Sequence, residues 1–145
     1  MSLSVPGVRT LPVSAHTAAD AAAALNVDIG RIAKSLVFYA VVSNEPILII
    51  ASGRNRVDKD LVGEYLGFKI KTASPDYCLQ VTGYAVGGVP PFSHKLRIRS
   101  LLDKDLLRYD TIWASAGTPN SLFPISPQEL VSISNAEIIM IKKDG

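Results

Sequence analysis

The chain has 145 residues, a formal net charge of +2 at neutral pH and 48% hydrophobic residues, which is enough apolar material to form one buried core. Its longest apolar runs, 36–42 and 47–51, are much shorter than the roughly 18 residues that indicate a membrane helix, and the N-terminus lacks the pattern of a secretory signal. We therefore expect a single domain over residues 1–145, a cytoplasmic location and no membrane partner.

The first third of the chain predicts a helix followed by a buried hairpin. Thr17 is placed to cap a short helix that contains the alanine run 21–24, and Asn26 is placed to end it. The next pattern is β-branched and aromatic, so residues 36–42 predict a strand and residues 47–51 predict its hairpin partner. Both runs are apolar on both faces, which indicates strands that are covered on two sides.

The remaining elements alternate between helices and strands, which indicates a mixed α/β domain. Each predicted helix starts at a residue that can accept backbone N–H groups, and glycine marks two of the ends. The predicted elements are a helix from Asp58 to Leu66 ended by Gly67, a helix from Ser74-Pro75 to Gly83, a half-exposed strand from Lys95 to Leu101, a strand over 110–115, a helix begun by the capping box 126–129, and a final strand over 136–141.

Lys34 is a charged residue inside the apolar segment 32–38. An unpaired buried ion costs several kcal/mol, and residues that break a local pattern often mark a functional site. The alternative is a lysine at the start of a strand, with its stem on the sheet and its ammonium in water. Position alone leaves both interpretations open.

Two segments rich in glycine follow later in the chain. The segment 82–92 contains Gly87 and Gly88 followed by Pro90 and Pro91, which predicts a rigid loop with accessible backbone N–H groups. Such groups can orient a bound carbonyl, although similar loops are also ordinary turns. The segment 113–120 is a second candidate of the same kind, with the same alternative.

Basic residues gather in two places. Arg54 and Arg56 lie close to Lys59, and a second group alternates along the predicted strand 95–101, so its members are expected to share a face. The second group consists of Lys95, Arg97 and Arg99. Both groups could contact nucleic-acid phosphates, but a solvated sheet face explains them equally, and the small net charge does not by itself indicate nucleic-acid binding.

Several common kinds of site lack the residues that they require. His16, His94 and a single cysteine are too few for a structural zinc site, and the phosphate-binding glycine motifs and the Gly-x-Ser-x-Gly motif are absent. We therefore predict no metal and no cofactor. Cys78, between Tyr77 and Leu79, is interpreted as a small helix-packing residue rather than a nucleophile.

The order of the motifs resembles the YbaK and prolyl-tRNA-synthetase-associated editing family. The resemblance covers about residues 16–133 and is carried by the ordered combination more than by any single motif. The matching segments are Ile-Ala-Lys-Ser-Leu-Val-Phe at 32–38, Ala-Ser-Gly at 51–53 with Arg-Val-Asp at 56–58, Thr-Gly-Tyr to Pro-Phe over 82–92, Ile-Trp-Ala-Ser-Ala-Gly at 112–117 and Ser-Pro-Gln-Glu-Leu at 126–130.

The resemblance implies a compact α/β domain with a mixed, barrel-like β-sheet flanked by short helices. It also implies hydrolysis of an amino acid wrongly esterified to tRNA, with Cys or Ala on proline tRNA expected first. The expected partner is the 3′ end of mischarged tRNA, and no DNA partner is expected. The sequence leaves open whether the protein acts as a monomer, as a homodimer or docked on prolyl-tRNA synthetase. Ser93 is a departure, because the family pattern has glycine at the position before His94.

The site residues expected from the family pattern and from the basic groups fall into three sets. The central active-site residue is Lys34. The substrate-binding residues are Gly87, Gly88, Val89, Pro90, Pro91, His94, Ser115, Gly117 and Thr118, and the tRNA-binding residues are Arg54, Arg56, Lys95, Arg97 and Arg99. No conventional nucleophile is needed, because an aminoacyl ester is already activated and its hydrolysis requires mainly placement of water and electrostatic stabilisation.

Two other classes of function fit the same residues. A binding module could keep the pocket and recognise tRNA or an aminoacyl group without hydrolysis. A small-molecule esterase is the third hypothesis, and it predicts activity on esters that carry no RNA.

Overall fold

The computed structural model describes residues 6–12 and 17–142. His16 and the N-terminal residues 1–5, considered above for metal binding and targeting, lie outside these ranges. No helix in the described part of the chain is long and apolar enough to cross a membrane.

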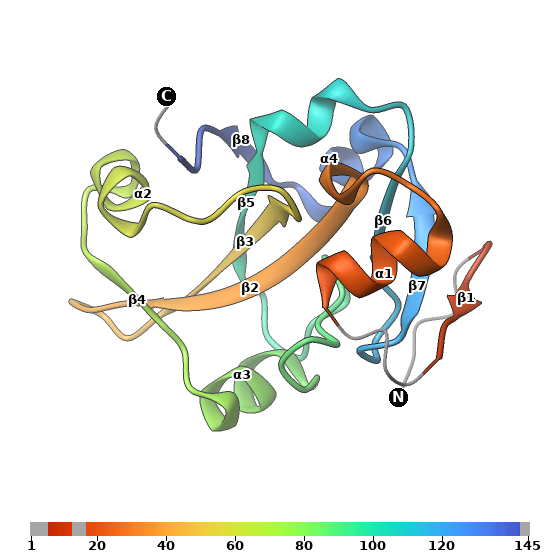
Figure 1. The fold of residues 1–145 in the computed structure, drawn as a ribbon. Helices are drawn as coiled ribbons and strands as arrows, with labels where there is room; N and C mark the ends of the chain where they lie inside the picture. The colour runs from red at the N-terminus through yellow and green to blue at the C-terminus, as the bar shows by residue number, and fades with distance from the viewer. Residues whose placement is uncertain (1–5, 13–16, 143–145) are drawn as a thin grey trace.

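In the described part of the chain, four α-helices surround one mixed sheet, which confirms the predicted class of a single α/β domain (Figure 1). The elements in chain order are β1 (Arg9–Thr10), α1 (Ala18–Leu25), a 3₁₀ helix (Ile29–Arg31), β2 (Ile32–Ala40), β3 (Pro46–Ser52), α2 (Lys59–Leu66), β4 (Ile70–Thr72), α3 (Pro75–Thr82), β5 (Arg99–Asp103), a second 3₁₀ helix (Lys104–Arg108), β6 (Ile112–Ser115), β7 (Ser121–Ile125), α4 (Pro127–Ser134) and β8 (Glu137–Ile139).

The α-helices begin where the capping residues predicted them. The side chains of Thr17, Asp58, Ser74 and Ser126 each accept a backbone N–H from the first turn of the following helix. Gly67 ends α2 in the left-handed conformation with φ +86°, which glycine adopts without a steric penalty. Residues at the helix ends are therefore sufficient to indicate where these helices begin and where α2 ends.

β2 is the strand on which the sheet is organised. One edge of β2 pairs with β3 in antiparallel register from Ala33 opposite Ser52 to Tyr39 opposite Pro46. The other edge is shared: β6 pairs in parallel with its first two residues, and β4 pairs antiparallel with Phe38 to Ala40. Residues 34–37 consequently have no registered partner strand on that second edge, although the backbone N–H of Ala73 donates to the carbonyl of Val37 (3.1 Å).

The sheet separates two main cores because alternate residues of a strand point to opposite faces. Val37, Leu48 and Ile50 pack with residues of α3 and α4 on one face. Phe38 and Ile49 pack with Val62 of α2 on the other face. Residues 47–51 of β3 are at most 3% exposed, which confirms for this run the prediction of a strand that is covered on two sides. The first run is covered less completely, because Leu36 and Tyr39 are half-buried and residues 41 and 42 are exposed.

The hairpin turn begins earlier than the apolar run predicts. The predicted strand 36–42 is replaced by β2, which ends at Ala40, and Val42 is 79% exposed. Asn44 adopts φ +63° and its N–H donates to the carbonyl of Ala40 (2.7 Å), which closes the turn. Hydrophobicity alone therefore extended the predicted strand into the turn.

The predicted strand from Lys95 to Leu101 is wrong in its first half. β5 starts at Arg99. Residues 95 and 96 instead donate their N–H groups to the carbonyls of Thr82 and Val81 at the end of α3 (2.9 and 3.1 Å). These bonds satisfy the helix end, so this segment cannot form a ladder, and Lys95, Arg97 and Arg99 do not alternate along one strand.

The remaining strand boundaries differ in smaller ways. Strand β6 omits Asp110 and Thr111, and β8 covers only Glu137–Ile139 of the predicted strand 136–141. The sequence interpretation missed β1, β4 and β7 altogether. All three strands are short. β1 and β4 depend on partner strands that are distant in sequence, whereas β7 also pairs with β6, the strand before it in the chain.

Asp103, at the end of β5, anchors the loop that follows β3. Its carboxylate is buried and accepts hydrogen bonds from the N–H of Ser52 (3.0 Å), the carboxamide of Asn55 (2.8 Å) and the N–H of Asp105 (2.9 Å). Buried polar groups are costly without partners, so these bonds hold the loop to one position. This loop continues to Arg56.

We expect Asp103→Ala to lower the free energy of unfolding by about 2 to 3 kcal/mol, because three donors lose their acceptor in a buried setting. Urea unfolding measures the change. Asp60→Ala, at an exposed position in the first turn of α2, is the control and should cost less than about 1 kcal/mol. Equal effects of the two substitutions would contradict the anchoring role.

Candidate functional site

A cavity of about 590 Å³ lies against the unpaired part of the β2 edge. Its walls come from β2, α1, the loop before α2, β4, α3, β6 and the loop over 86–89. Most of the lining is apolar, and a few polar side chains enter it. This combination is typical of sites for small molecules or for the end of a larger substrate.

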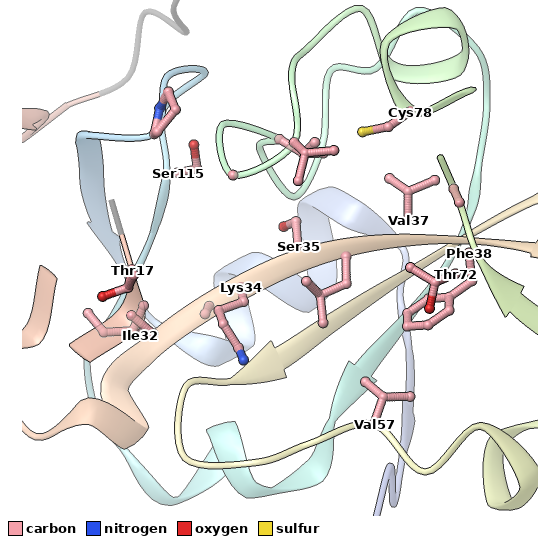
Figure 2. A pocket seen from close by; sticks show the side chains of 18 of the residues that line it. Thr17, Ile32, Lys34, Ser35, Val37, Phe38, Val57, Thr72, Cys78 and Ser115 are labelled. Atoms are coloured by element: carbon pink, nitrogen blue, oxygen red, sulfur yellow. The ribbon is translucent and has the colours of Figure 1, made fainter. Parts of the chain in front are cut away.

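The cavity extends to both faces of β2. Figure 2 shows that Lys34 and Ser35 project to opposite sides of the strand, as neighbouring residues of a strand must. Lys34 shares its side with Val57, whereas Cys78 and Ser115 lie on the side of Ser35. The space passes from one face to the other only because no strand covers the edge between β6 and β4.

The half that contains Lys34 is positively charged. Arg56 and Lys59 also line the cavity, and none of the described lining residues is acidic. Burial and, to a smaller extent, the charge of Arg56 hold the pKa of Lys34 below its ordinary value. Lys34 makes no ion pair with the described residues, so its charge is available to an anion or a polarised carbonyl.

The half that contains Ser35 is mainly apolar. Val37, Cys78 and Val89 belong to one core cluster and line this part of the cavity. Ser35 differs from them, because its hydroxyl is buried and has no hydrogen-bond partner among the described residues. Such groups are rare in folded proteins and commonly mark a binding or catalytic position.

The two glycine segments predicted from the sequence pack against each other. A Cβ on Gly88 would lie 3.0 Å from backbone atoms of Thr118, which is closer than most Cβ contacts, so the close approach of the two loops favours glycine. Gly87 adopts φ +87° and lines the cavity together with Val89. Ser115, at the end of β6, also lines it, and its hydroxyl accepts the N–H of Gly117 (3.2 Å).

The other predicted substrate-binding residues support these loops and do not line the cavity. They are Gly88, Pro90, Pro91, His94, Gly117 and Thr118. The Nε2 atom of His94 is 2.6 Å from the carbonyl oxygen of Pro90, and burial lowers the pKa of the imidazole. A neutral imidazole that donates to Pro90 would fix the end of the loop.

Ser93 adopts the left-handed conformation with φ +63°. This is the position at which the resemblance described above predicts glycine, and glycine is the residue that adopts this backbone conformation most easily. The loop therefore keeps its turn although it has a side chain there. Ser93 is exposed, so its side chain displaces no packing.

The predicted tRNA-binding residues differ in their surroundings. Arg54 pairs with Asp28, and Arg99 pairs with Glu137 (2.7 Å), whose pKa is lowered to about 2 chiefly by this guanidinium. Arg56 lies at the cavity. Lys95 and Arg97 are exposed in the loop after α3.

The described residues contain no group of three or more side chains suited to hold a metal ion. Cys78 packs in the core, and burial raises the pKa of its thiol, so the structure gives no support to a thiolate nucleophile. The lining residues that the sequence interpretation missed include Ser35, Asn55 and Val57. Ser35 follows Lys34 directly, but nothing in the local pattern distinguished it from other strand serines.

Comparison with known proteins gives consistent matches. A family model described as "Aminoacyl-tRNA editing domain" matches residues 13–133. The chain is 34% identical to the uncharacterized protein YwhH of Bacillus subtilis (strain 168), over 90% of this chain and 83% of that protein. It is 26% identical to EbsC of Enterococcus faecalis (strain ATCC 700802 / V583), described as a candidate Cys-tRNA(Pro)/Cys-tRNA(Cys) deacylase, over 87% of this chain and 77% of that protein.

One solved structure is similar over nearly the whole chain. It is described as a candidate trans-editing enzyme for prolyl-tRNA synthetase and is 38% identical, with a TM-score of 0.89, over 94% of this chain and 86% of that one. The two chains are therefore similar in sequence as well as in fold.

We expect Arg56→Gln to raise the pKa of Lys34, because the substitution removes the nearby positive charge while burial remains. In the wild-type protein the cationic fraction of Lys34 falls at a lower pH than that of an exposed lysine, and in the variant it persists to higher pH. NMR titration of the Lys34 side chain measures both midpoints. Arg9→Gln, on the exposed strand β1, is the control and should leave the midpoint unchanged. An unchanged midpoint in Arg56→Gln would refute the coupling.

Proposed function

The chain belongs to the aminoacyl-tRNA editing domain family, and we propose that it is a free-standing hydrolase of mischarged tRNA, with Cys- or Ala-tRNA(Pro) as its first expected substrates. The observation that carries this proposal is the half-buried cation of Lys34, which has no ion-pair partner and no acidic neighbour in the cavity lining among the residues that the structure describes. An aminoacyl ester at the end of a nucleic acid presents both a phosphate and a carbonyl to such a cation.

Lys34 acts as an electrostatic clamp in this proposal. An aminoacyl ester needs no strong nucleophile, so placement of the ester and stabilisation of negative charge on its carbonyl oxygen supply much of the rate. Lys34, Arg56 and Lys59 attract the 3′ end of the tRNA into the charged half of the cavity. A ribose hydroxyl of the substrate then assists the attacking water, because none of the lining residues in the described ranges is a histidine or a carboxylate.

The apolar half of the cavity suits a small amino acid. Val37, Cys78 and Val89 are fixed in the core, so this half cannot expand freely to admit a large side chain. A difference of one methyl or thiol group is worth only about 1 to 3 kcal/mol in such a pocket. The choice between Cys and Ala therefore rests on small differences in packing.

The second candidate is a binding module that recognises the aminoacyl end of tRNA without hydrolysis. The lack of a histidine or a carboxylate among the described lining residues favours it, because no side chain is an evident general base. Prolyl-tRNA synthetase, named in the description of a similar structure, is the first protein partner to test for either candidate.

We expect Lys34→Met to lower single-turnover deacylation of mischarged Cys- or Ala-tRNA(Pro) by a hundredfold or more, equivalent to about 3 kcal/mol of transition-state stabilisation. Methionine keeps most of the apolar stem, so the fold should persist, as circular dichroism would check. The control is Lys104→Ala, at an exposed position after β5.

Normal turnover by folded Lys34→Met would refute the assignment of Lys34. Wild-type protein that binds but does not hydrolyse a broad panel of mischarged tRNAs would favour the binding module. Turnover of simple esters that lack RNA, at a rate comparable to that of mischarged tRNA, would favour an esterase instead.

We expect the double substitution of Lys95 and Arg97 by Ala to reduce the salt dependence of tRNA binding. Each phosphate contact on a single strand contributes about 0.7 to the slope of log K against log salt. Binding titrations at several salt concentrations measure the slope. The paired substitution of the exposed Lys69 and Lys71 by Ala is the matched control. An equal loss of slope in both variants would show general charge rather than a tRNA contact at 95 and 97.

A further inference from the structure

The open edge of β2 presents main-chain hydrogen-bonding groups to the cavity. Val37 accepts the N–H of Ala73 (3.1 Å) and Val41 donates to Lys69 (2.9 Å), both on the β4 side, whereas Ala40 donates to Glu45 on the β3 side (2.9 Å). Alternate residues of a strand bond to opposite neighbours, so odd-numbered residues of β2 direct these groups toward the β4 and β6 edge.

Ser35 is the odd-numbered residue in the middle of the interruption. The ladder with β6 ends at Ala33 and the ladder with β4 begins at Phe38, so neither strand provides a partner for the N–H and the carbonyl of Ser35. Its hydroxyl is also buried and has no hydrogen-bond partner in residues 6–12 and 17–142. One residue therefore offers a donor, an acceptor and a hydroxyl to the same cavity.

The interruption has room for one amino-acid residue. From Ala33 to Val37 the strand advances about 13 Å, at roughly 3.3 Å per residue. An opposing residue in an antiparallel hydrogen-bonded pair uses its own N–H and its own carbonyl to bond a single partner residue. The amine and the carbonyl of an aminoacyl ester have this same relationship.

We propose that the aminoacyl group of the substrate binds as a one-residue antiparallel strand paired with Ser35. Its amine donates to the Ser35 carbonyl and hydroxyl, and its ester carbonyl accepts the Ser35 N–H. The proposal rests on the proposed function for the identity of the substrate. It assigns to Ser35, a residue outside the predicted site, the recognition of the α-amine.

This pairing also places the rest of the substrate. Directly opposed residues of an antiparallel pair direct their side chains to the same face, so the amino-acid side chain lies with Ser35, Val37 and Cys78 in the apolar half. The ester oxygen takes the next position, opposite Lys34, and the nucleotide follows on the side of β2 to which Lys34 projects; Figure 2 shows the direction of this side chain. The cations thus meet the phosphate, while the substrate ammonium stays at the edge of β2, beside the carbonyl and the hydroxyl of Ser35.

A parallel orientation is disfavoured by charge. It would bond the carbonyl to the N–H of Val37 and put the amino-acid side chain on the face of Lys34. The nucleotide would then lie on the apolar side of the strand, away from Lys34 and Arg56. The two orientations are distinguishable because they use different backbone N–H groups.

The test uses two stable amide analogues of the substrate end. One is 3′-deoxy-3′-(L-alanylamino)adenosine, and the other carries a propionyl group and so lacks the amine. We expect the Ser35 amide to exchange rapidly with solvent in the free protein and to be protected by the alanyl analogue, as measured by NMR hydrogen exchange. We also expect the alanyl analogue to bind about tenfold or more tightly than the propionyl analogue.

Substitutions at Ser35 distinguish the contribution of its hydroxyl to binding from the contribution of its backbone groups. Ser35→Ala should reduce the ratio of alanyl to propionyl affinity several-fold, and Ser35→Thr, which keeps the hydroxyl and suits a strand, should preserve the ratio. Ser100→Ala is the matched control, because Ser100 is a buried serine of β5 that does not line the cavity. It should leave the ratio unchanged.

Any of three results would overturn the proposal. The alanyl analogue could protect the amide of Val37 in place of that of Ser35, the Ser35 amide could already be protected in the free protein, or the two analogues could bind with equal affinity. An unchanged ratio in Ser35→Ala would overturn the role of the hydroxyl. The amides are not hydrolysed, so these readings do not depend on turnover. Binding with Ser35 protection but no deacylation would refute the hydrolase and keep the pairing, whereas deacylation without protection would refute the pairing alone.

Discussion

The interrupted pairing of β2 is the constraint on which the candidate site depends. β2 pairs with β3 over most of its length and so joins the cores on the two faces of the sheet, yet its second edge is divided between β6 and β4. Because neither strand covers the middle of that edge, residues from both faces line one cavity. A continuous sheet would separate Lys34 from Ser35 by a full layer of backbone.

Much of the fold could be predicted from the sequence, because the signals for helices are local. A capping side chain such as Thr17 or Ser74 and the first turn that it serves lie within a few residues of each other. The short strands could not be predicted in the same way, because β4 exists only through its pairing with β2. The strand predicted from Lys95 was wrong for a related reason, since the N–H groups of residues 95 and 96 bond to carbonyls at the end of α3.

The residues of the candidate site likewise include some that have a local sequence signal and others that depend on distant parts of the chain. Lys34 and the glycine loops were identifiable because each contradicts its local pattern or restricts its own backbone. Ser35 was not, because its importance comes from partners that are missing across the sheet, and no neighbouring residue encodes that absence. Asn55 was missed because its buried position depends on Asp103, 48 residues away in sequence.

The separation of Lys34 and Ser35 on opposite faces also makes the site handed. When the amine and the carbonyl of an occupant are fixed on the edge of a strand, the configuration at its α-carbon alone decides which face receives the side chain. An L-residue paired with Ser35 places its side chain among apolar groups, and a D-residue held by the same two bonds would direct it toward Lys34 and Arg56. The edge of β2 thus supplies a geometric basis for stereochemical selection that requires no additional residue.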